Sequence, residues 1–217
     1  MPPTEDLGFT HKFVPGKQGA SQPTLLLLHG TGGDENDLLP LGRDLWPDAA
    51  LLSVRGKVME NGMPRFFRRF AEGVFDVEDL KFRTEELAQF LDVASKNYHF
   101  SLRHLIAVGY SNGANIAASL ILQHPHYLAA SVLFRVMMPF TPDIVRDFSH
   151  LSVFLGAGVR DPIAGRGQVE ELTGILQSGG ADVTTFWHRG GHELGADDVE
   201  AATAWLSEDK IRKRLAA

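Results

Sequence analysis

The chain lacks cysteine altogether, and this absence excludes disulfide bonds, thiolate metal sites and a cysteine nucleophile from its 217 residues. A surplus of basic residues is missing as well, and the formal net charge of −6 argues against a nucleic-acid-binding surface. No apolar run approaches the roughly 20 residues of a membrane span, and the first residues, MPPTEDLGF, do not form a signal peptide. These absences predict a soluble, cytoplasmic protein with no nucleic-acid partner and no membrane span.

What the chain does contain is an alternation of short apolar runs with helical patterns. The apolar runs predict strands at 24–28, 50–54, 102–108, 128–137, 151–157 and 182–187, with an edge strand at 9–14. The helical patterns cover 37–45, 80–98, 112–123, 168–177 and 196–206, whereas residues 55–79 read as irregular. Such alternation predicts an α/β fold in one domain, residues 1–217, with a mostly parallel sheet covered by helices on both faces.

Chemistry in a sheet of this kind gathers at the edge where the parallel strands end. One apolar run leads into Gly109-Tyr110-Ser111-Asn112-Gly113, a G-x-S-x-G pattern between a predicted strand and a predicted helix. A serine on so sharp a turn projects its hydroxyl above the sheet, and the two glycines let strand and helix approach closely. This placement favours Ser111 as a nucleophile over the alternative, a glycine-rich turn with a capping serine.

A serine nucleophile needs a base, and in this geometry the acid and then the histidine follow the serine along the chain. Asp161 lies in a turn just past a strand end, and we predict that it is the acid. Asp143 and Asp147 are weaker alternatives because they follow a different strand. His192 comes after two glycines that let a loop fold back over the sheet edge, which predicts it as the base. His188 lies closer to the strand and is expected to be a polar residue near that loop.

A tetrahedral intermediate also requires N–H donors that point at its oxyanion. The backbone N–H of Asn112, directly after the nucleophile, is one predicted donor. The other is the N–H of Thr31, in the loop His29-Gly-Thr-Gly-Gly after the first clear strand. A phosphate-binding loop is the alternative, but neither G-x-x-x-x-G-K-[ST] nor G-x-G-x-x-G is present. No metal and no organic cofactor is expected.

In chain order, Leu-His-Gly-Thr-Gly-Gly, Gly-Tyr-Ser-Asn-Gly, Gly-x-x-Asp-Pro and Gly-Gly-His-Glu-Leu resemble the motifs of the α/β-hydrolase superfamily. From about Thr24 to Leu206 the chain is similar to the small phospholipase/carboxylesterase family, which includes acyl-protein thioesterases. The segments RG at 55–56, RFF at 65–67 and EGVFD at 72–76 further resemble its bacterial branch of hydroquinone-stress carboxylesterases. Many relatives carry Gln where this chain has Asn112, so the substrate preference of the thioesterases is not carried over.

The resemblance implies an α/β-hydrolase fold without a large cap, a small-molecule ester substrate and, in many members, a homodimer. Together with the residues above, it predicts a serine carboxylesterase that hydrolyses small to medium esters through an acyl-enzyme on Ser111. A thioesterase or lysophospholipase that uses the same triad stays open as an alternative. A non-catalytic binding protein of the same fold would be expected to have lost part of the constellation, whereas here every part is present.

The segment 55–75 follows a strand end and is rich in phenylalanine, which is typical of a pocket for a hydrophobic acyl or aryl group. The predicted pocket residues are Phe66, Phe67, Phe70 and, after a later strand end, Met138. Arg65, Arg68 and Arg69 of the same segment would favour an anionic substrate. The competing interpretation is that the phenylalanines pack in the core and the arginines face water.

Overall fold

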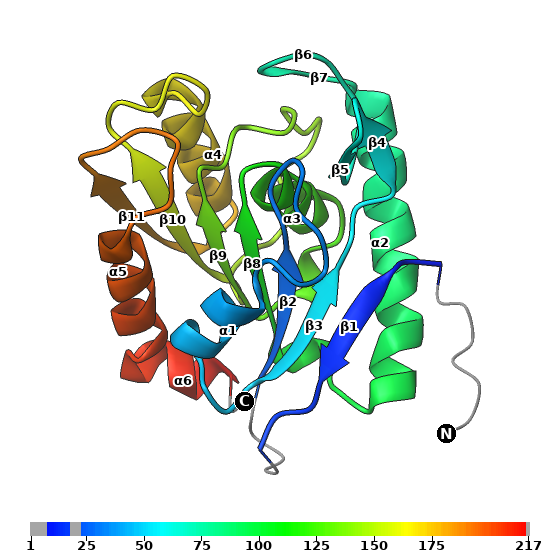
Figure 1. The fold of residues 1–217 in the computed structure, drawn as a ribbon. Coiled ribbons are helices and arrows are strands. Elements are labelled where there is room, and N and C mark those ends of the chain that lie inside the picture. The colour runs from blue at the N-terminus through cyan, green and yellow to red at the C-terminus, as the bar shows by residue number, and fades with distance from the viewer. Residues whose placement is uncertain (1–7, 18–22, 216–217) are drawn as a thin grey trace.

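The protein is described by a computed structural model that covers residues 8–17 and 23–215, and a seven-stranded sheet runs through its centre (Figure 1). The strand order is β1-β3-β2-β8-β9-β10-β11, and every pair is parallel except β1 with β3. The strands are β1 (His11–Val14), β2 (Thr24–Leu28), β3 (Ala50–Val54), β8 (Leu105–Tyr110), β9 (Ala130–Phe134), β10 (Ser152–Gly158) and β11 (Asp182–His188). The predicted edge strand is β1, the one antiparallel member.

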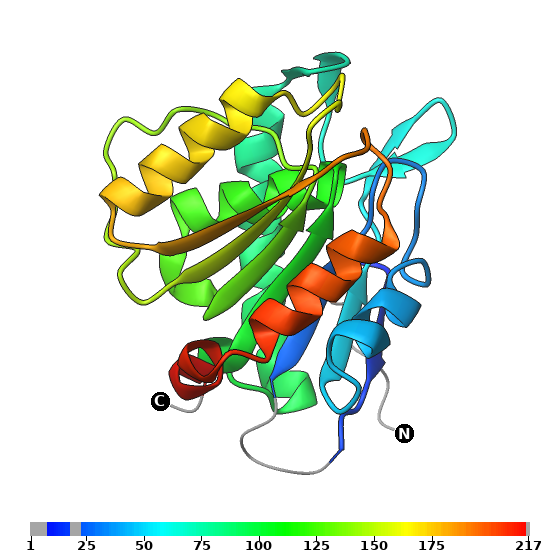
Figure 2. The same ribbon diagram turned by 90° about the vertical axis from the view of Figure 1, so that its left-hand side faces the viewer.

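Helices cover both faces of this sheet, as Figure 2 shows from the side. One face carries α1 (Leu39–Leu45), α5 (Ala196–Leu206) and α6 (Asp209–Leu215). The opposite face carries α2 (Val77–Tyr98), α3 (Asn112–Gln123) and α4 (Arg166–Ser178). The predicted fold class, a mostly parallel sheet between two helical layers, is therefore confirmed. The extent of a single domain over residues 1–217 stays a prediction.

The sheet explains why its strands are apolar without polar alternation. Successive side chains of a strand point to opposite faces. Accordingly Leu26 and Leu28 of β2 pack in the cluster with α2, α3 and α4, whereas Leu25 and Leu27 pack in the cluster with α1 and α5. All four leucines are fully buried, so each face of the strand contributes to a core.

A short 3₁₀ turn precedes each of two central strands whose boundaries differ from those predicted. The turn η1 (Leu102–His104) precedes β8, and the Ser101 hydroxyl oxygen accepts a hydrogen bond from the Arg103 N–H at its start. The turn η2 (Pro125–Tyr127) precedes β9. The apolar Leu102 of η1 extends the apparent strand pattern in the sequence, so β8 begins at Leu105 and not at residue 102 as predicted. The strand predicted at 128–137 is shorter at both ends, because β9 spans only Ala130–Phe134.

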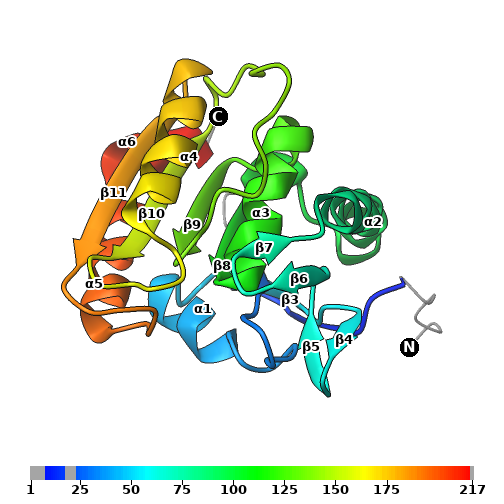
Figure 3. The same cartoon turned by 90° about the horizontal axis from the view of Figure 1, so that it is seen from above.

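The segment predicted as irregular, 55–79, contains two hairpins and the start of α2. The first hairpin pairs β4 (Val58–Glu60) with β5 (Met63–Arg65), and the second pairs β6 (Arg69–Ala71) with β7 (Val74–Phe75). Asn61 and Gly62 form the first turn with φ of 51° and 79°, the conformation that an Asn-Gly hairpin favours. Seen from above, both hairpins lie beside the carboxyl edge of the sheet (Figure 3). No large cap is present among the described residues.

No helix among the described residues combines the length and the apolar character that a membrane span requires.

Candidate active site

The predicted nucleophile lies between the end of β8 and the start of α3, on a backbone turn that few residues adopt. Ser111 has φ of 51° and ψ of −113°, outside the regions that L-residues favour. A Cβ on Gly113 would overlap the carbonyl oxygen of Leu28, and a Cβ on Gly109 would meet the Ala114 backbone at 2.7 Å. The two glycines therefore permit the close approach of α3 to β2 and β8, and the strained serine between them is presented at the sheet edge.

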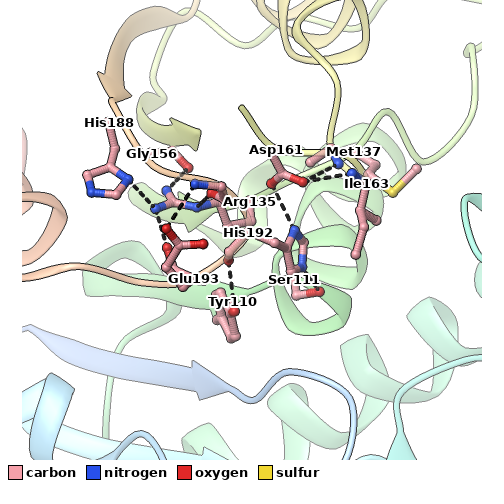
Figure 4. Close-up of polar contacts among 12 residues, drawn as sticks. Tyr110, Ser111, Arg135, Met137, Gly156, Asp161, Ile163, His188, His192 and Glu193 are labelled. Carbon is pink, nitrogen blue, oxygen red and sulfur yellow. Dashed lines mark hydrogen bonds and ion pairs between the residues drawn. The ribbon is translucent and has the colours of Figure 1, made fainter. Parts of the chain in front are cut away.

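Three of the predicted side chains form a continuous hydrogen-bonded chain at this edge (Figure 4). His192 Nε2 lies 2.8 Å from the Ser111 hydroxyl oxygen, and His192 Nδ1 lies 2.8 Å from Asp161 Oδ2. A carboxylate oxygen can only accept, so the arrangement assigns the imidazole proton to Nδ1 and leaves Nε2 free to accept from the serine. The other carboxylate oxygen, Asp161 Oδ1, accepts from the N–H groups of Ile163 and Ala164 at 2.8 and 2.9 Å.

The alternatives to these residues have other partners. His188 Nδ1 accepts from the Gly190 N–H at 3.0 Å and lies 3.3 Å from Arg135 Nη2. Asp147 accepts from the Ser149 N–H, and both Asp143 and Asp147 are exposed. The structure thus brings Ser111, Asp161 and His192 together and leaves the alternatives outside the constellation, while the catalytic roles themselves stay predictions.

The two predicted oxyanion donors are held by the hairpin segment. Arg65 Nη1 donates to the Thr31 hydroxyl at 2.6 Å, and the Phe66 N–H donates to Asn112 Oδ1 at 2.7 Å. The next residue of the loop, Gly32, donates its N–H to the carbonyl of Pro64 at 2.9 Å. Within residues 8–17 and 23–215, the N–H groups of Thr31 and Asn112 themselves donate to no protein acceptor. The side chains are fixed while the two backbone donors remain available to a ligand.

A cavity of about 290 Å³ opens beside the serine. Its lining consists of Thr31, Arg65, Arg69, Glu72, Gly73, Phe75, Tyr110, Ser111, Asn112, Asn115, Met137, Ile163 and His192. Hollows of about 550 and 640 Å³ lie elsewhere on the surface, but neither is lined by a serine with a histidine next to it. The candidate site is therefore identified by its serine and histidine and not by the volume of the cavity.

The predicted pocket wall requires correction, because none of its four residues lines this cavity. Phe66 and Phe67 are buried in the core, and Phe70 is 77% exposed. Neighbouring strand residues point to opposite sides, so Phe70 faces away where Arg69 faces the cavity. Met138 likewise packs against the core beside Met137. The apolar wall is built instead from Phe75, Met137 and Ile163.

The three arginines of the hairpin segment have different surroundings. The side chain of Arg68 is 62% exposed and pairs with Asp76 and Asp79, outside the cavity lining. The side chain of Arg65 is only 3% exposed, and burial, followed by the neighbouring Arg69 charge, lowers its pKa to about 10. Arg65 therefore remains a cation at neutral pH. The interpretation that all the arginines face water holds for Arg68 alone.

A fully buried arginine that sequence reasoning missed holds the loop of His192 (Figure 4). Arg135 follows β9 with φ of 56°, and its guanidinium binds the buried Asp198 carboxylate at 2.9 and 2.7 Å. Its Nε donates to the carbonyl of Gly191 at 3.0 Å, and its Nη2 donates to the carbonyl of Glu193 at 2.6 Å. These two carbonyls flank His192, so the arginine fixes the backbone on both sides of the predicted base.

Tyr110 adds a further hydrogen bond to the same loop. Its hydroxyl donates to the carbonyl of His192 itself at 2.9 Å, and its ring lies 5.8 Å from the imidazole. Burial raises the pKa of Tyr110, so the hydroxyl keeps its proton and acts as a donor throughout the neutral range. Three consecutive carbonyls, 191–193, are thereby hydrogen-bonded to side chains.

The first residue of the oxyanion loop is a buried histidine whose titration is linked to folding. His29 is 1% exposed, its Nδ1 lies 2.6 Å from the Gly30 carbonyl, and its Nε2 accepts from the Gly56 N–H at 3.0 Å. Burial lowers the pKa of His29 below its ordinary value of 6.5. Protonation of Nε2 would remove the acceptor for Gly56.

We therefore expect the free energy of unfolding to decrease as the pH falls below about 6.5, because the unfolded chain then binds a proton that folded His29 resists. The slope attributable to His29 is at most about 1.4 kcal/mol per pH unit and ends at the lowered folded pKa. Urea unfolding between about pH 7 and 5 measures it. The control His29→Gln should be less stable at pH 7 and should show a flatter profile. An equally steep profile in His29→Gln would assign the slope to other groups.

Among the described residues, no group of three or more His, Asp or Glu side chains could hold a metal ion. The absence of a cofactor stays a prediction.

Comparison with known proteins gives relatives over nearly the whole chain, although no family model matches it. The chain is 49% identical over 192 residues to a Bacillus subtilis (strain 168) protein named "Putative hydrolase MhqD". The aligned residues cover 88% of this chain and 96% of that protein. The crystal structure of the Bacillus cereus carboxylesterase is 50% identical, covers 94% of each chain and superposes with a TM-score of 0.90. A carboxylesterase from Mesorhizobium loti is 32% identical and covers 95% of this chain and 98% of its own, with a TM-score of 0.86.

The two solved structures cover 94% and 95% of this chain, so the likeness is not confined to the G-x-S-x-G motif. They confirm the resemblance inferred from the motifs. The chain belongs to the carboxylesterase family of the α/β-hydrolases.

Proposed function

We propose that this protein is a serine carboxylesterase that hydrolyses small to medium carboxylic esters through an acyl-enzyme on Ser111. The observation that carries the proposal is the chain of two 2.8 Å contacts from Ser111 through His192 to Asp161, beside a cavity with unused backbone donors. The family relationship to carboxylesterases supports the same activity.

In the first half of the proposed reaction, His192 Nε2 takes the proton of Ser111 as the serine oxygen attacks the ester carbonyl. Asp161 accepts from Nδ1 and stabilises the imidazolium that forms. The N–H groups of Thr31 and Asn112 stabilise the oxyanion of the tetrahedral intermediate. The intermediate collapses when His192 protonates the departing alcohol, and the acyl group remains on Ser111.

In the second half, water replaces the alcohol. His192 removes a proton from the water, which attacks the acyl carbonyl, and the same two N–H groups stabilise the second oxyanion. Collapse of this intermediate returns the proton to Ser111 and releases the carboxylic acid. The loop that carries His192 must hold one position through both halves, which is the role that Arg135 and Tyr110 support.

The cavity argues for substrates of limited size. Its volume of about 290 Å³ is just below the range of about 300–1,000 Å³ for small-molecule sites. Its wall of Phe75, Met137 and Ile163 is apolar but short. A lysophospholipase or a thioesterase with the same triad remains the second candidate, and no feature of the cavity favours either over a short ester.

Wild-type enzyme should therefore hydrolyse p-nitrophenyl esters with short acyl chains and lose kcat/KM as the chain outgrows the cavity. The assay compares acyl chains of increasing length with a thioester of the preferred acyl group, and Ser111→Ala serves as the background control. Equal inertness of wild type and Ser111→Ala across the series would contradict the proposal. A thioester preferred over its matched ester would move the assignment to the second candidate.

Three further proposals concern the domain extent, the location and the oligomeric state of the protein. We propose one domain over residues 1–217, a cytoplasmic location, which the lack of cysteine supports, and a homodimer, which rests on the family resemblance alone. Sedimentation equilibrium of the purified chain measures the last of these directly.

A further inference from the structure

The cavity beside Ser111 contains a cation with unused hydrogen-bonding capacity. Arg65 Nη1 donates to Thr31 and Arg65 Nε donates to the carbonyl of Phe67 at 3.2 Å. Its remaining terminal nitrogen, Nη2, makes no hydrogen bond to any residue in the described part of the chain. A buried guanidinium with a nitrogen unpaired is unfavourable unless a ligand or water completes it.

Counter-charge for this cation is scarce, because one carboxylate serves two guanidinium groups. Glu60 accepts from Arg69 Nε at 3.1 and 3.2 Å and lies 3.0 Å from Arg69 Nη2. The same carboxylate is 3.5 Å from Arg65 Nη1, beyond a good hydrogen bond. Arg65 and Arg69 both line the cavity, whereas Glu60 does not.

Two further lining residues change the tendency of the cavity to bind an anion, one raising it and the other lowering it. Asn115 is 4% exposed, and its Oδ1 accepts from the Met137 N–H at 2.8 Å. Its amide nitrogen has no partner among the described residues and so adds a neutral donor to the lining. Glu72 adds a negative charge, but it is exposed at the turn of the β6–β7 hairpin, where water screens it.

From this lining we propose that the enzyme prefers esters whose acyl part carries a carboxylate, bound by Arg65 and Arg69 a few bonds from the scissile carbonyl. Arginine binds carboxylates through parallel N–H donors. A substrate carboxylate would therefore supply the hydrogen-bond partner that Arg65 Nη2 lacks among the described residues. This inference rests on the proposed esterase function, whose site it shares.

The position of the arginines assigns the carboxylate to the acyl part of the ester. His192 must protonate the departing alcohol, so the alcohol lies on the side of the β11–α5 loop that carries His192. Figure 3 shows that loop and the two hairpins on opposite sides of β8. Arg65 and Arg69 come from the hairpins, and the acyl group is the part of the substrate that extends toward them.

The test compares monomethyl succinate with methyl isocaproate, whose isopropyl end has the shape of the carboxylate without its charge. Methanol release gives kcat/KM for each ester, and their ratio is the measured quantity. Wild type should show a ratio of at least about 10 in favour of the succinate half-ester, and added salt should lower it. Arg69→Gln and Arg65→Met should each lower the ratio about tenfold.

Two charge variants serve as matched controls. Glu72→Gln removes the negative charge at the rim and should raise the ratio. Arg68→Gln removes an arginine that points away from the cavity and should leave the ratio unchanged. Arg69 and Glu72 lie near the surface, so these variants test the inference even if Arg65→Met fails to fold.

A wild-type ratio at or below one overturns the inference, as does a ratio that neither Arg69→Gln nor Glu72→Gln alters. Both results leave the proposed function intact if p-nitrophenyl acetate is hydrolysed in the same samples. Absence of hydrolysis for p-nitrophenyl acetate and for both methyl esters instead contradicts the proposed function itself.

Discussion

Replacement of Ser111 by alanine is expected to lower kcat by a factor on the order of 10⁶. The other hydroxyls of the cavity lining, those of Thr31 and Tyr110, bond to Arg65 and to the His192 carbonyl and not to the His192 imidazole, so neither is activated in its place. The fold should not change, since the alanine retains the Cβ of a residue whose hydroxyl, among the described residues, bonds only to His192. Single-turnover kinetics with a p-nitrophenyl ester measures the loss, and circular dichroism verifies the fold.

The same experiment has internal controls, because the triad acts as a unit. His192→Ala and the double variant Ser111→Ala/His192→Ala should lose about as much as Ser111→Ala alone. Asp161→Asn should lose about 10⁴-fold in kcat, because an amide at this position no longer favours the productive imidazole tautomer. Independent, additive losses from Ser111 and His192 would show that the 2.8 Å contact between them is not used in the reaction.

Replacement of Arg135 by methionine is expected to reduce the free energy of unfolding by about 3–5 kcal/mol, because it leaves the Asp198 carboxylate buried without its cation. The Arg135 and Asp198 side chains have no exposed surface, and the carbonyls of Gly156, Gly191 and Glu193 would lose donors as well. A domain of ordinary stability has about 5–15 kcal/mol in total, so the variant should be close to unfolding at 37 °C. Urea unfolding followed by tryptophan fluorescence measures the change.

Two further variants separate the charge of Arg135 from its geometry. Arg135→Lys keeps the charge but loses the fork that reaches several acceptors at once, so it should recover only part of the stability. In Arg135→Met/Asp198→Leu neither charge of this buried pair remains, and much of the loss should be recovered. The folded fraction of each should still show a lower kcat, because the loop of His192 has lost its donors. A fully stable Arg135→Met with unchanged kcat would contradict this role.

Much of the fold is encoded in local patterns, which is why it could be predicted. The five-residue run of β2 is buried on both faces, and this leaves an apolar signature that no polar alternation obscures. Ser111, Asp161 and His192 lie more than 30 residues apart, but each lies directly after a strand of the sheet or in the short loop that follows one. A parallel sheet brings such ends to one edge, so the pattern of strands was sufficient to place them together.

The hairpins were missed although a local signal for them existed. Asn61-Gly62 between short apolar segments is a strong hairpin turn, and both residues adopt the positive φ that the turn requires. The aromatic composition of the segment predicted a pocket wall of phenylalanines instead. Composition does not say which side of a short strand faces the cavity, so Phe70 was assigned to the wall that its neighbour Arg69 occupies.

Arg135 was missed for a different reason. An arginine within the apolar run LFRVMM is an unusual core residue and marks a buried pair, because a charged side chain is rarely buried alone. The sequence does not name its partners, however, since Asp198 and the carbonyls around His192 lie more than 50 residues away. Only the packing of α5 and the β11–α5 loop against the end of β9 identifies them.

The central claim, an acyl-enzyme on Ser111, is tested most directly by covalent labelling. A fluorophosphonate reacts with a serine that a neighbouring histidine activates and forms a stable analogue of the tetrahedral intermediate. We expect one phosphonyl group per chain, located by mass spectrometry on Ser111, with no labelling of Ser111→Ala and greatly reduced labelling of His192→Ala. Labelling of a different serine, or equal labelling of wild type and Ser111→Ala, would contradict the account.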